Sequence, residues 1–199
     1  MSDQLKHECG VALLRLRKPK EHYARMYGTE HYGFQKSALL LEKQHNRGQD
    51  GAGLACLHLH PQPGLPCYDV EKSCGTMPLA ELLEQCGRRI AAKPDVFSGN
   101  VLLGHLRYAT FGRHDIHACH PFICESSFLN RILMLAGNFN LTDTKDIFRN
   151  LVRSGHHPAG DSDGYLIIQL LTHYLEQELA RFGECRNFAK ILREPASHF

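Results

Sequence analysis

The chain has 199 residues, of which 43% are hydrophobic and 22% charged, and its net charge is +2 with histidine neutral. This composition is that of a globular protein with a sizeable core, and it gives no electrostatic basis for binding nucleic acid or an anionic membrane. The first eight residues lack the apolar core of a secretory signal, and no apolar run could span a bilayer. We therefore expect a cytoplasmic protein whose eight cysteines are reduced.

The first half of the chain predicts two strands and a helix. The apolar segment 11–16 is typical of a buried strand, and residues 18–32 show no clear periodicity and are interpreted as an excursion. Apolar residues at helical spacing then predict a helix from Phe34 to about Gln44, which ends in a loop rich in turn-forming residues. Alternation over 54–59 predicts a second strand.

The second half predicts two more strands and three helices. One helix has Pro78 in its first turn, and the short apolar runs 101–106 and 132–136 are typical of central strands. Asp143 is placed to cap a helix, and a longer helix follows Asp163. The expected buried face of the helix after Asp143 consists of Ile147, Phe148, Leu151 and Val152. The longer helix carries the apolar and aromatic residues Ile167, Leu170, Leu171, Tyr174, Leu175, Leu179 and Phe182. Sheets in this order need helices to cover them, which favours an α+β fold.

Cys9 precedes Gly10 and opens the first predicted strand. If residues 1–8 were removed, the α-amine of Cys9 could act as general base for its own thiol. An α-amine titrates at about 7.7 to 8.0 and a free thiol at about 8.5, so proton transfer between them is well matched near neutral pH. The alternative is an unreactive core cysteine, because free cysteines are among the most buried residues.

Three polar motifs follow predicted strands or begin a helix. In residues 104–110, Arg107 could bind a carboxylate bidentately, or it could simply pair with a surface acid. In residues 137–143, the Asn138 amide and the next backbone N–H could stabilise an oxyanion, although the same residues favour an ordinary turn. In residues 160–163, an aspartate could cap the helix or bind an ammonium group.

A group of histidines and cysteines raises the alternative of a zinc site. It consists of His114, His117, Cys119, His120 and Cys124. Their spacing fits none of the usual structural zinc patterns, so we expect a histidine-rich polar loop and no metal site.

Taken in order, five motifs resemble those of the class II, or N-terminal nucleophile, glutamine amidotransferases. They are Cys9-Gly10-Val11, residues 47–53, 104–110 and 138–143, and Asp161-Ser162-Asp163. The similarity is greatest to the amidophosphoribosyltransferase branch. It implies a four-layer αββα sandwich of antiparallel sheets, with residues 1–8 as a leader and 9–199 as an amidotransferase domain that is incomplete at its C-terminus.

The resemblance also implies a role for each matching residue. Cys9 would attack the side-chain amide of glutamine, and the ammonia released would serve the synthesis of phosphoribosylamine, the first step of purine biosynthesis. Asn138 and the backbone N–H of Phe139 would hold the oxyanion. Glutamine itself would be bound by Arg107, Thr110 and Asp161, with Arg47 close to the nucleophile.

Two further expectations come from this resemblance. The family usually has glycine where this chain has Phe139, and a positive φ there would be costly for phenylalanine. The partner implied is a phosphoribosyltransferase domain beyond the sequence, so Mg²⁺ or an iron–sulfur cluster would belong to that domain, and the full-length protein would be a homo-oligomer. The alternatives are an inactive or regulatory glutamine-binding module that keeps its leader, or another class II amidotransferase.

Overall fold

A computed structural model describes residues 8–109 and 115–182. Residues 1–7, the predicted ligand Thr110 and residues 183–199 therefore lie outside the described part. The chain divides into two compact units. The first runs to Phe122 and includes Met134–Asn140, and the second takes in Ile123–Leu133 and the chain from Leu141 onward. The fold is α+β with antiparallel pairing in the main sheet, as the sequence predicts.

A four-stranded sheet forms the centre of the first unit, in the order β1-β4-β2-β3. Its strands are β1 (Gly10–Arg15), β2 (Gly51–Leu57), β3 (Tyr68–Ser73) and β4 (Val101–Arg107), and every neighbouring pair is antiparallel. The strands predicted at 11–16 and 101–106 are confirmed, and the latter is central. The strand predicted at 54–59 begins and ends earlier, at Gly51 and Leu57.

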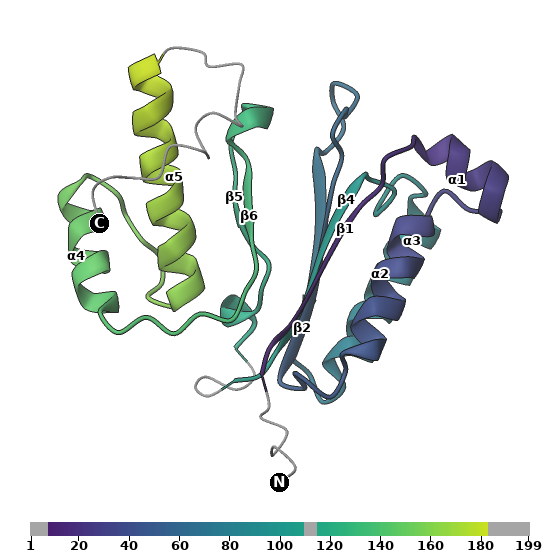
Figure 1. The fold of residues 1–199 in the computed structure, drawn as a ribbon, viewed down its shortest axis with the longest axis horizontal. Helices are drawn as coiled ribbons and strands as arrows, with labels where there is room; N and C mark the ends of the chain where they lie inside the picture. Colours follow the sequence, from purple (N-terminus) through teal and green to yellow (C-terminus); the bar gives the residue numbers. More distant parts are fainter. Residues whose placement is uncertain (1–7, 110–114, 183–199) are drawn as a thin grey trace, which may run out of the picture. The chain divides into compact units, whose positions relative to one another are not determined.

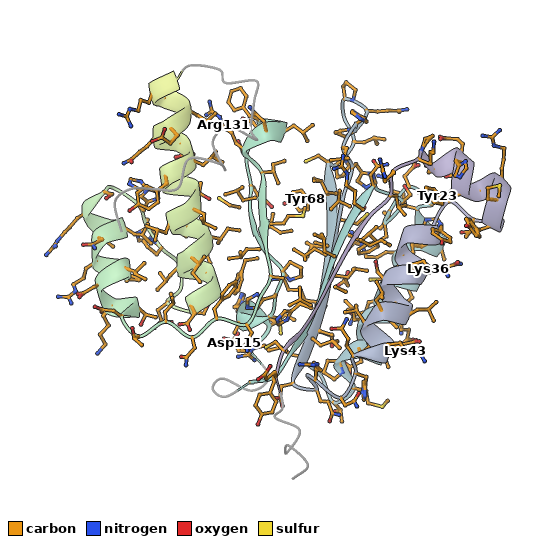
Figure 2. All side chains as sticks on the ribbon, viewed as in Figure 1. Tyr23, Lys36, Lys43, Tyr68, Asp115 and Arg131 are labelled. Carbon is orange, nitrogen blue, oxygen red and sulfur yellow. The ribbon has the colours of Figure 1, made fainter. Side chains whose placement is uncertain are left out.

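Three helices belong to the same unit: α1 (Lys20–Tyr27), α2 (Tyr32–Lys43) and α3 (Pro78–Ala92). Helix α2 packs on β1 and β4, and α3 packs on β2 and β3, so both cover one face of the sheet (Figure 1). Leu41 of α2 and Leu82 of α3 are fully buried in the resulting core. Lys36 and Lys43 project from the outer side of α2 (Figure 2).

The interpretation of residues 18–32 as an irregular excursion is wrong, because Lys20–Tyr27 is helix α1. No residue of this helix is buried, so it lacks the apolar stripe by which helices are found in a sequence. Gly28 ends it in the left-handed conformation, with φ of 74°. A stack of Tyr23 (labelled in Figure 2), Tyr27 and Tyr32 joins it to the start of α2.

The prediction that strand β1 is buried holds for one face only. Val11 is 41% and Leu13 is 68% exposed, whereas Ala12 between them is buried in the core. Successive side chains of a strand point to opposite faces, and α2 covers only one face of β1. The apolar run alone could not distinguish a strand covered on both faces from one covered on a single face.

The second unit contains α4 (Thr144–Arg153) and α5 (Asp163–Phe182), which pack on one another. Asp143 caps α4 as predicted, because its carboxylate accepts a hydrogen bond from the Asp146 N–H at 3.3 Å. The expected buried face of α4 is partly wrong, since Val152 is 49% exposed. On α5, Leu171 and Tyr174 are 48% and 42% exposed.

Shorter elements complete the structure. Strands β5 (Phe122–Cys124) and β6 (Leu133–Leu135) form a separate two-stranded sheet, so the strand predicted at 132–136 exists but is not central. Two 3₁₀ turns, η1 (Ile116–Ala118) and η2 (Leu129–Arg131), precede these strands. Across the described ranges, no helix combines the length and apolar character needed to cross a bilayer.

Candidate functional site

The Cys9 thiol lies where β1 begins and β4 ends. Gly10 pairs with Leu106 in the antiparallel register, which brings Cys9 next to the residues that follow Leu106. The Tyr108 N–H donates to the Cys9 Sγ at 3.4 Å, and the thiol faces the Tyr108 carbonyl oxygen at 3.8 Å. Cys9 is half-buried. The backbone of Tyr108 thus fixes the position of the thiol without a histidine or carboxylate partner among the described side chains.

The loop before β2 packs tightly against the end of β4. The Asp50 N–H donates to the Arg107 carbonyl at 3.0 Å, and the Asp50 carboxylate accepts from the Ala109 N–H at 2.9 Å. A Cβ at Gly48 would lie 2.6 Å from the Leu106 carbonyl oxygen, so only glycine allows this approach. Asp50 therefore anchors the segment that carries Arg107 and contacts Cys9, a role the sequence did not predict.

The two predicted arginine ligands lie near this junction. Arg107 is the last residue of β4 and is half-buried. Arg47 is exposed, and its guanidinium lies 3.7 Å from the Glu8 carboxylate, directly before Cys9 in the chain. An exposed ion pair at that distance contributes little to stability. It nevertheless places Arg47 beside the residue that a leader cleavage at Cys9 would remove.

The predicted oxyanion turn, Gly137–Asn140, is tied to β4 by a buried histidine. His105 Nε2 lies 3.1 Å from the Gly137 carbonyl oxygen, and only a protonated Nε2 can donate this bond. Asn138 itself is exposed. Phe139 does not adopt the costly positive φ, because Phe97 is the only described non-glycine residue that does so. The turn is thus compatible with phenylalanine in the place of glycine.

His105 and His120 form a buried stack behind this turn. Their ring centroids are 4.4 Å apart, and the ring of Phe139 lies 5.6 Å from that of His120. Burial lowers the pKa of His105 to about 4 and that of His120 to about 3, so both rings are neutral near pH 7. The sequence did not predict this stack. His105 lies within the recognised segment 104–110, but no spacing rule pairs it with His120.

The predicted aspartates belong to the second unit. Asp161 is exposed, just before α5. Asp163, in the first turn of α5, accepts a hydrogen bond from the Leu141 N–H at 2.9 Å. Asp163 therefore binds the backbone that follows the oxyanion turn, whereas Asp161 keeps its carboxylate at the surface.

The expected polar loop at 114–124 is partly wrong, because Cys119 is fully buried and His120 is 9% exposed. Among the described residues, neither side chain belongs to a cluster of three metal-ligating groups. The Cys119 thiol lies 3.5 Å from the Asp115 carbonyl oxygen, and burial raises its pKa to about 11. His117 and Cys124 join no described cluster of metal-ligating groups. His114 lies outside the described residues.

No family model matches the chain, but its sequence is similar to those of several curated proteins. An amidophosphoribosyltransferase of Methanocaldococcus jannaschii is 30% identical over 158 residues, covering 77% of this chain and 29% of that protein. The amidophosphoribosyltransferase of Mus musculus is 28% identical over 139 residues, which is 70% of this chain and 24% of the mouse protein. A glutamine--fructose-6-phosphate aminotransferase (isomerizing) of Sulfolobus acidocaldarius is 25% identical over 153 residues, 76% of this chain and 23% of that protein.

The chain is thus similar to enzymes of the class II glutamine amidotransferase family that its motifs resemble. It spans less than a third of the length of the curated relatives it matches. In this chain, four of the five recognised segments meet in the first unit: Cys9, the loop at 47–53, the end of β4 and the segment 137–140. Short backbone contacts and one buried histidine hold them together.

Proposed function

We propose that this chain is the glutaminase domain of an amidophosphoribosyltransferase. It hydrolyses glutamine and supplies ammonia for the synthesis of phosphoribosylamine from phosphoribosyl pyrophosphate, in purine biosynthesis. On this proposal residues 1–8 are a leader, residues from 9 onward form an N-terminal nucleophile hydrolase domain of four αββα layers, and a phosphoribosyltransferase domain acts in the same protein.

Cys9 is the nucleophile of the proposed reaction. After removal of the leader, its α-amine takes the thiol proton and the thiolate attacks the amide carbon of glutamine. The C–N bond then breaks, and the α-ammonium returns the proton to the leaving ammonia. Water attacks the resulting thioester, which releases glutamate and restores the thiol. The sum is glutamine plus water giving glutamate plus ammonia.

The other predicted residues bind and stabilise. The Asn138 amide and the Phe139 N–H carry the oxyanion, for which each such donor is worth about 3 kcal/mol of barrier. Arg107 and Thr110 bind the α-carboxylate of glutamine, and Asp161 binds its α-ammonium. Arg47, which pairs with Glu8 in this structure, takes the place near Cys9 that the resemblance implies.

The observation that carries this proposal is the junction of β1 and β4. A half-buried thiol is held there by the Tyr108 backbone, and removal of residues 1–8 would add a free α-amine to the same residue. The loop before β2 packs against this junction, because Gly48 lies close to the Leu106 backbone and the Asp50 carboxylate accepts from the Ala109 N–H. The matches to amidophosphoribosyltransferases from several organisms support the same assignment.

Glutamate release from glutamine tests the proposal. We expect activity in a chain whose intact mass shows that it begins at Cys9, and a loss of about a thousandfold or more in Cys9→Ala. The matched control is Cys124→Ala, a half-buried cysteine of β5, which should keep the activity. Activity that persists in Cys9→Ala would contradict the assignment.

An inactive or regulatory glutamine-binding module is the second candidate, because Arg47 pairs with the Glu8 carboxylate next to Cys9. The same experiment separates the two. A purified chain that keeps residues 1–8, binds glutamine and releases no glutamate would favour the module over the enzyme. An active chain that begins at Cys9 would exclude it.

A further inference from the structure

A second group of reactive side chains lies at the opposite end of the main sheet from Cys9. The sequence Cys56-Leu57-His58-Leu59-His60 places a potential metal ligand at every second position. Alternate residues of an extended chain point to one face, so Cys56 and His58 share a side. Cys56 pairs with Asp69 across the β2–β3 ladder, which adds a carboxylate to the same face.

The three side chains meet at one point. The Cys56 Sγ, a His58 ring nitrogen and an Asp69 carboxylate oxygen all lie within 4.8 Å of one another, and His58 Nε2 is 3.0 Å from Asp69 Oδ2. Cys56 is fully buried and Asp69 is 6% exposed. Thiolate, imidazole and carboxylate are the ligands of zinc, which binds them at about 2.0 to 2.3 Å in tetrahedral geometry.

A strained turn directs two backbone donors at the two acidic ligands. The Phe97 N–H donates to Asp69 Oδ2 at 2.9 Å, and the Gly99 N–H donates to the Cys56 Sγ at 3.2 Å. Phe97 adopts a φ of 55°, a conformation that costs about 1–3 kcal/mol in a residue other than glycine. Hydrogen bonds of this kind orient metal ligands and stabilise their anionic forms.

The surrounding charges leave room for a divalent cation. Arg89 lies 3.4 Å from Asp69 Oδ1, but it makes closer bonds to the Glu71 carboxylate at 2.9 Å and the Val70 carbonyl at 2.6 Å. Asp69 Oδ2 is in hydrogen-bond contact with His58 Nε2 and accepts from the Phe97 N–H, so a metal would replace its direct contact with His58 while Arg89 stays paired with Glu71. A divalent ion with a Cys56 thiolate and the Asp69 carboxylate is neutral overall, which a buried site requires.

The cluster opens on a cavity of about 590 Å³, lined by His58, His60, Asp69, Arg89, Lys93 and Asn100 among others. His60 lines the same cavity and, with water, is a candidate for a fourth ligand. We propose that Cys56, His58 and Asp69 bind one Zn²⁺ ion, which joins β2, β3 and the turn at 95–99. The site is independent of the glutaminase reaction.

Binding has a defined proton balance. Burial raises the pKa of the Cys56 thiol to about 12, although the hydrogen bond from the Gly99 N–H lowers it. The thiol is therefore protonated in the free protein, and the metal must displace that proton as the Zn–S bond forms.

Metal titration of the full chain tests the proposal. After treatment with a chelator, the protein should take up one Zn²⁺ per chain in equilibrium dialysis, and Co²⁺ in its place should give a sulfur-to-cobalt charge-transfer band. Cys56→Ser should abolish that band, and His58→Gln should weaken Zn²⁺ binding at least about tenfold. Cys67→Ser is the matched control, because Cys67 is a half-buried cysteine of the same hairpin and should leave binding unchanged.

The proposal fails if the wild-type chain binds no stoichiometric Zn²⁺, or if His58→Gln binds it as tightly as the wild type. His58 is half-buried, so its substitution decides the question even if Cys56→Ser does not fold. Binding that is lost in Cys67→Ser and kept in both ligand variants would place the ion elsewhere and would also overturn the proposal.

Discussion

Acid should destabilise the protein through the stacked histidines His105 and His120. Burial is the largest cause that lowers their pKa values, to about 4 and about 3. The positive charge of Arg107 lowers both pKa values further, and those of Lys72 and of a protonated His105 lower that of His120. The Gly137 carbonyl opposes the shift at His105 without cancelling it. Neither ring can therefore take up a proton at mildly acidic pH while the protein stays folded.

The sign and size follow from proton linkage. A histidine in the unfolded chain has a pKa of about 6.5, so between that value and the folded pKa the unfolded chain binds more protons. Stability is complete above about pH 6.5 and falls as the pH drops toward the folded values. Between pH 7.5 and pH 5, linkage gives a loss of about 2 kcal/mol for each histidine and about 4 kcal/mol for the pair.

Urea denaturation at the two pH values measures this loss. With a slope of about 2 kcal/mol per molar urea, the midpoint of the wild-type chain should fall by about 2 M at pH 5. His120→Phe keeps a ring beside His105 and removes one titrating group, so its shift should be about half as large. His45→Asn changes an exposed histidine and should leave the shift intact. Equal shifts in wild type and His120→Phe would refute the reasoning.

Three further substitutions test the packing around the site. Gly53→Ala would place a Cβ 1.9 Å from the His120 carbonyl oxygen, so we expect a loss of about 3 kcal/mol or more in thermal or urea unfolding. Asp143→Ala removes the N-cap of α4 and should lower the free energy of unfolding by about 1 kcal/mol, whereas Asp143→Asn should keep most of it. Asp50→Ala leaves the Ala109 N–H without its acceptor. The variant should lower kcat/KM for glutamine about tenfold or more, with little change in secondary structure. Unchanged kinetics would show that Asp50 is not part of the site.

Elements with a strong apolar pattern could be predicted from the sequence, and those without one could not. Helix α3 and strand β4 carry apolar residues at the expected spacing and bury them in the core. Helix α1 buries no residue and β3 is largely polar, so only tertiary packing identifies them. Exposure of Leu13 on β1 shows the same limit, because an apolar run does not say which faces are covered.

The site divides in a similar way. Cys9, Arg107 and Asn138 could be proposed as site residues from the sequence. Each residue type has a suitable chemistry, and each residue lies in one of the recognised motifs. The contacts that position them could not, since the bond from His105 to the Gly137 carbonyl joins residues 32 positions apart. Such bonds depend on the register of the strands and the path of the loops, and a local sequence pattern predicts neither.

The central claim is that Cys9, once it is the first residue, is the nucleophile that attacks glutamine. The direct measurement is to treat a chain that begins at Cys9 with a glutamine-derived electrophile and to map the modified residue by mass spectrometry. We expect one label per chain, on Cys9, in preference to the other cysteines, and protection by glutamine. A label on another cysteine, or equal labelling of a chain that keeps residues 1–8, would contradict the claim.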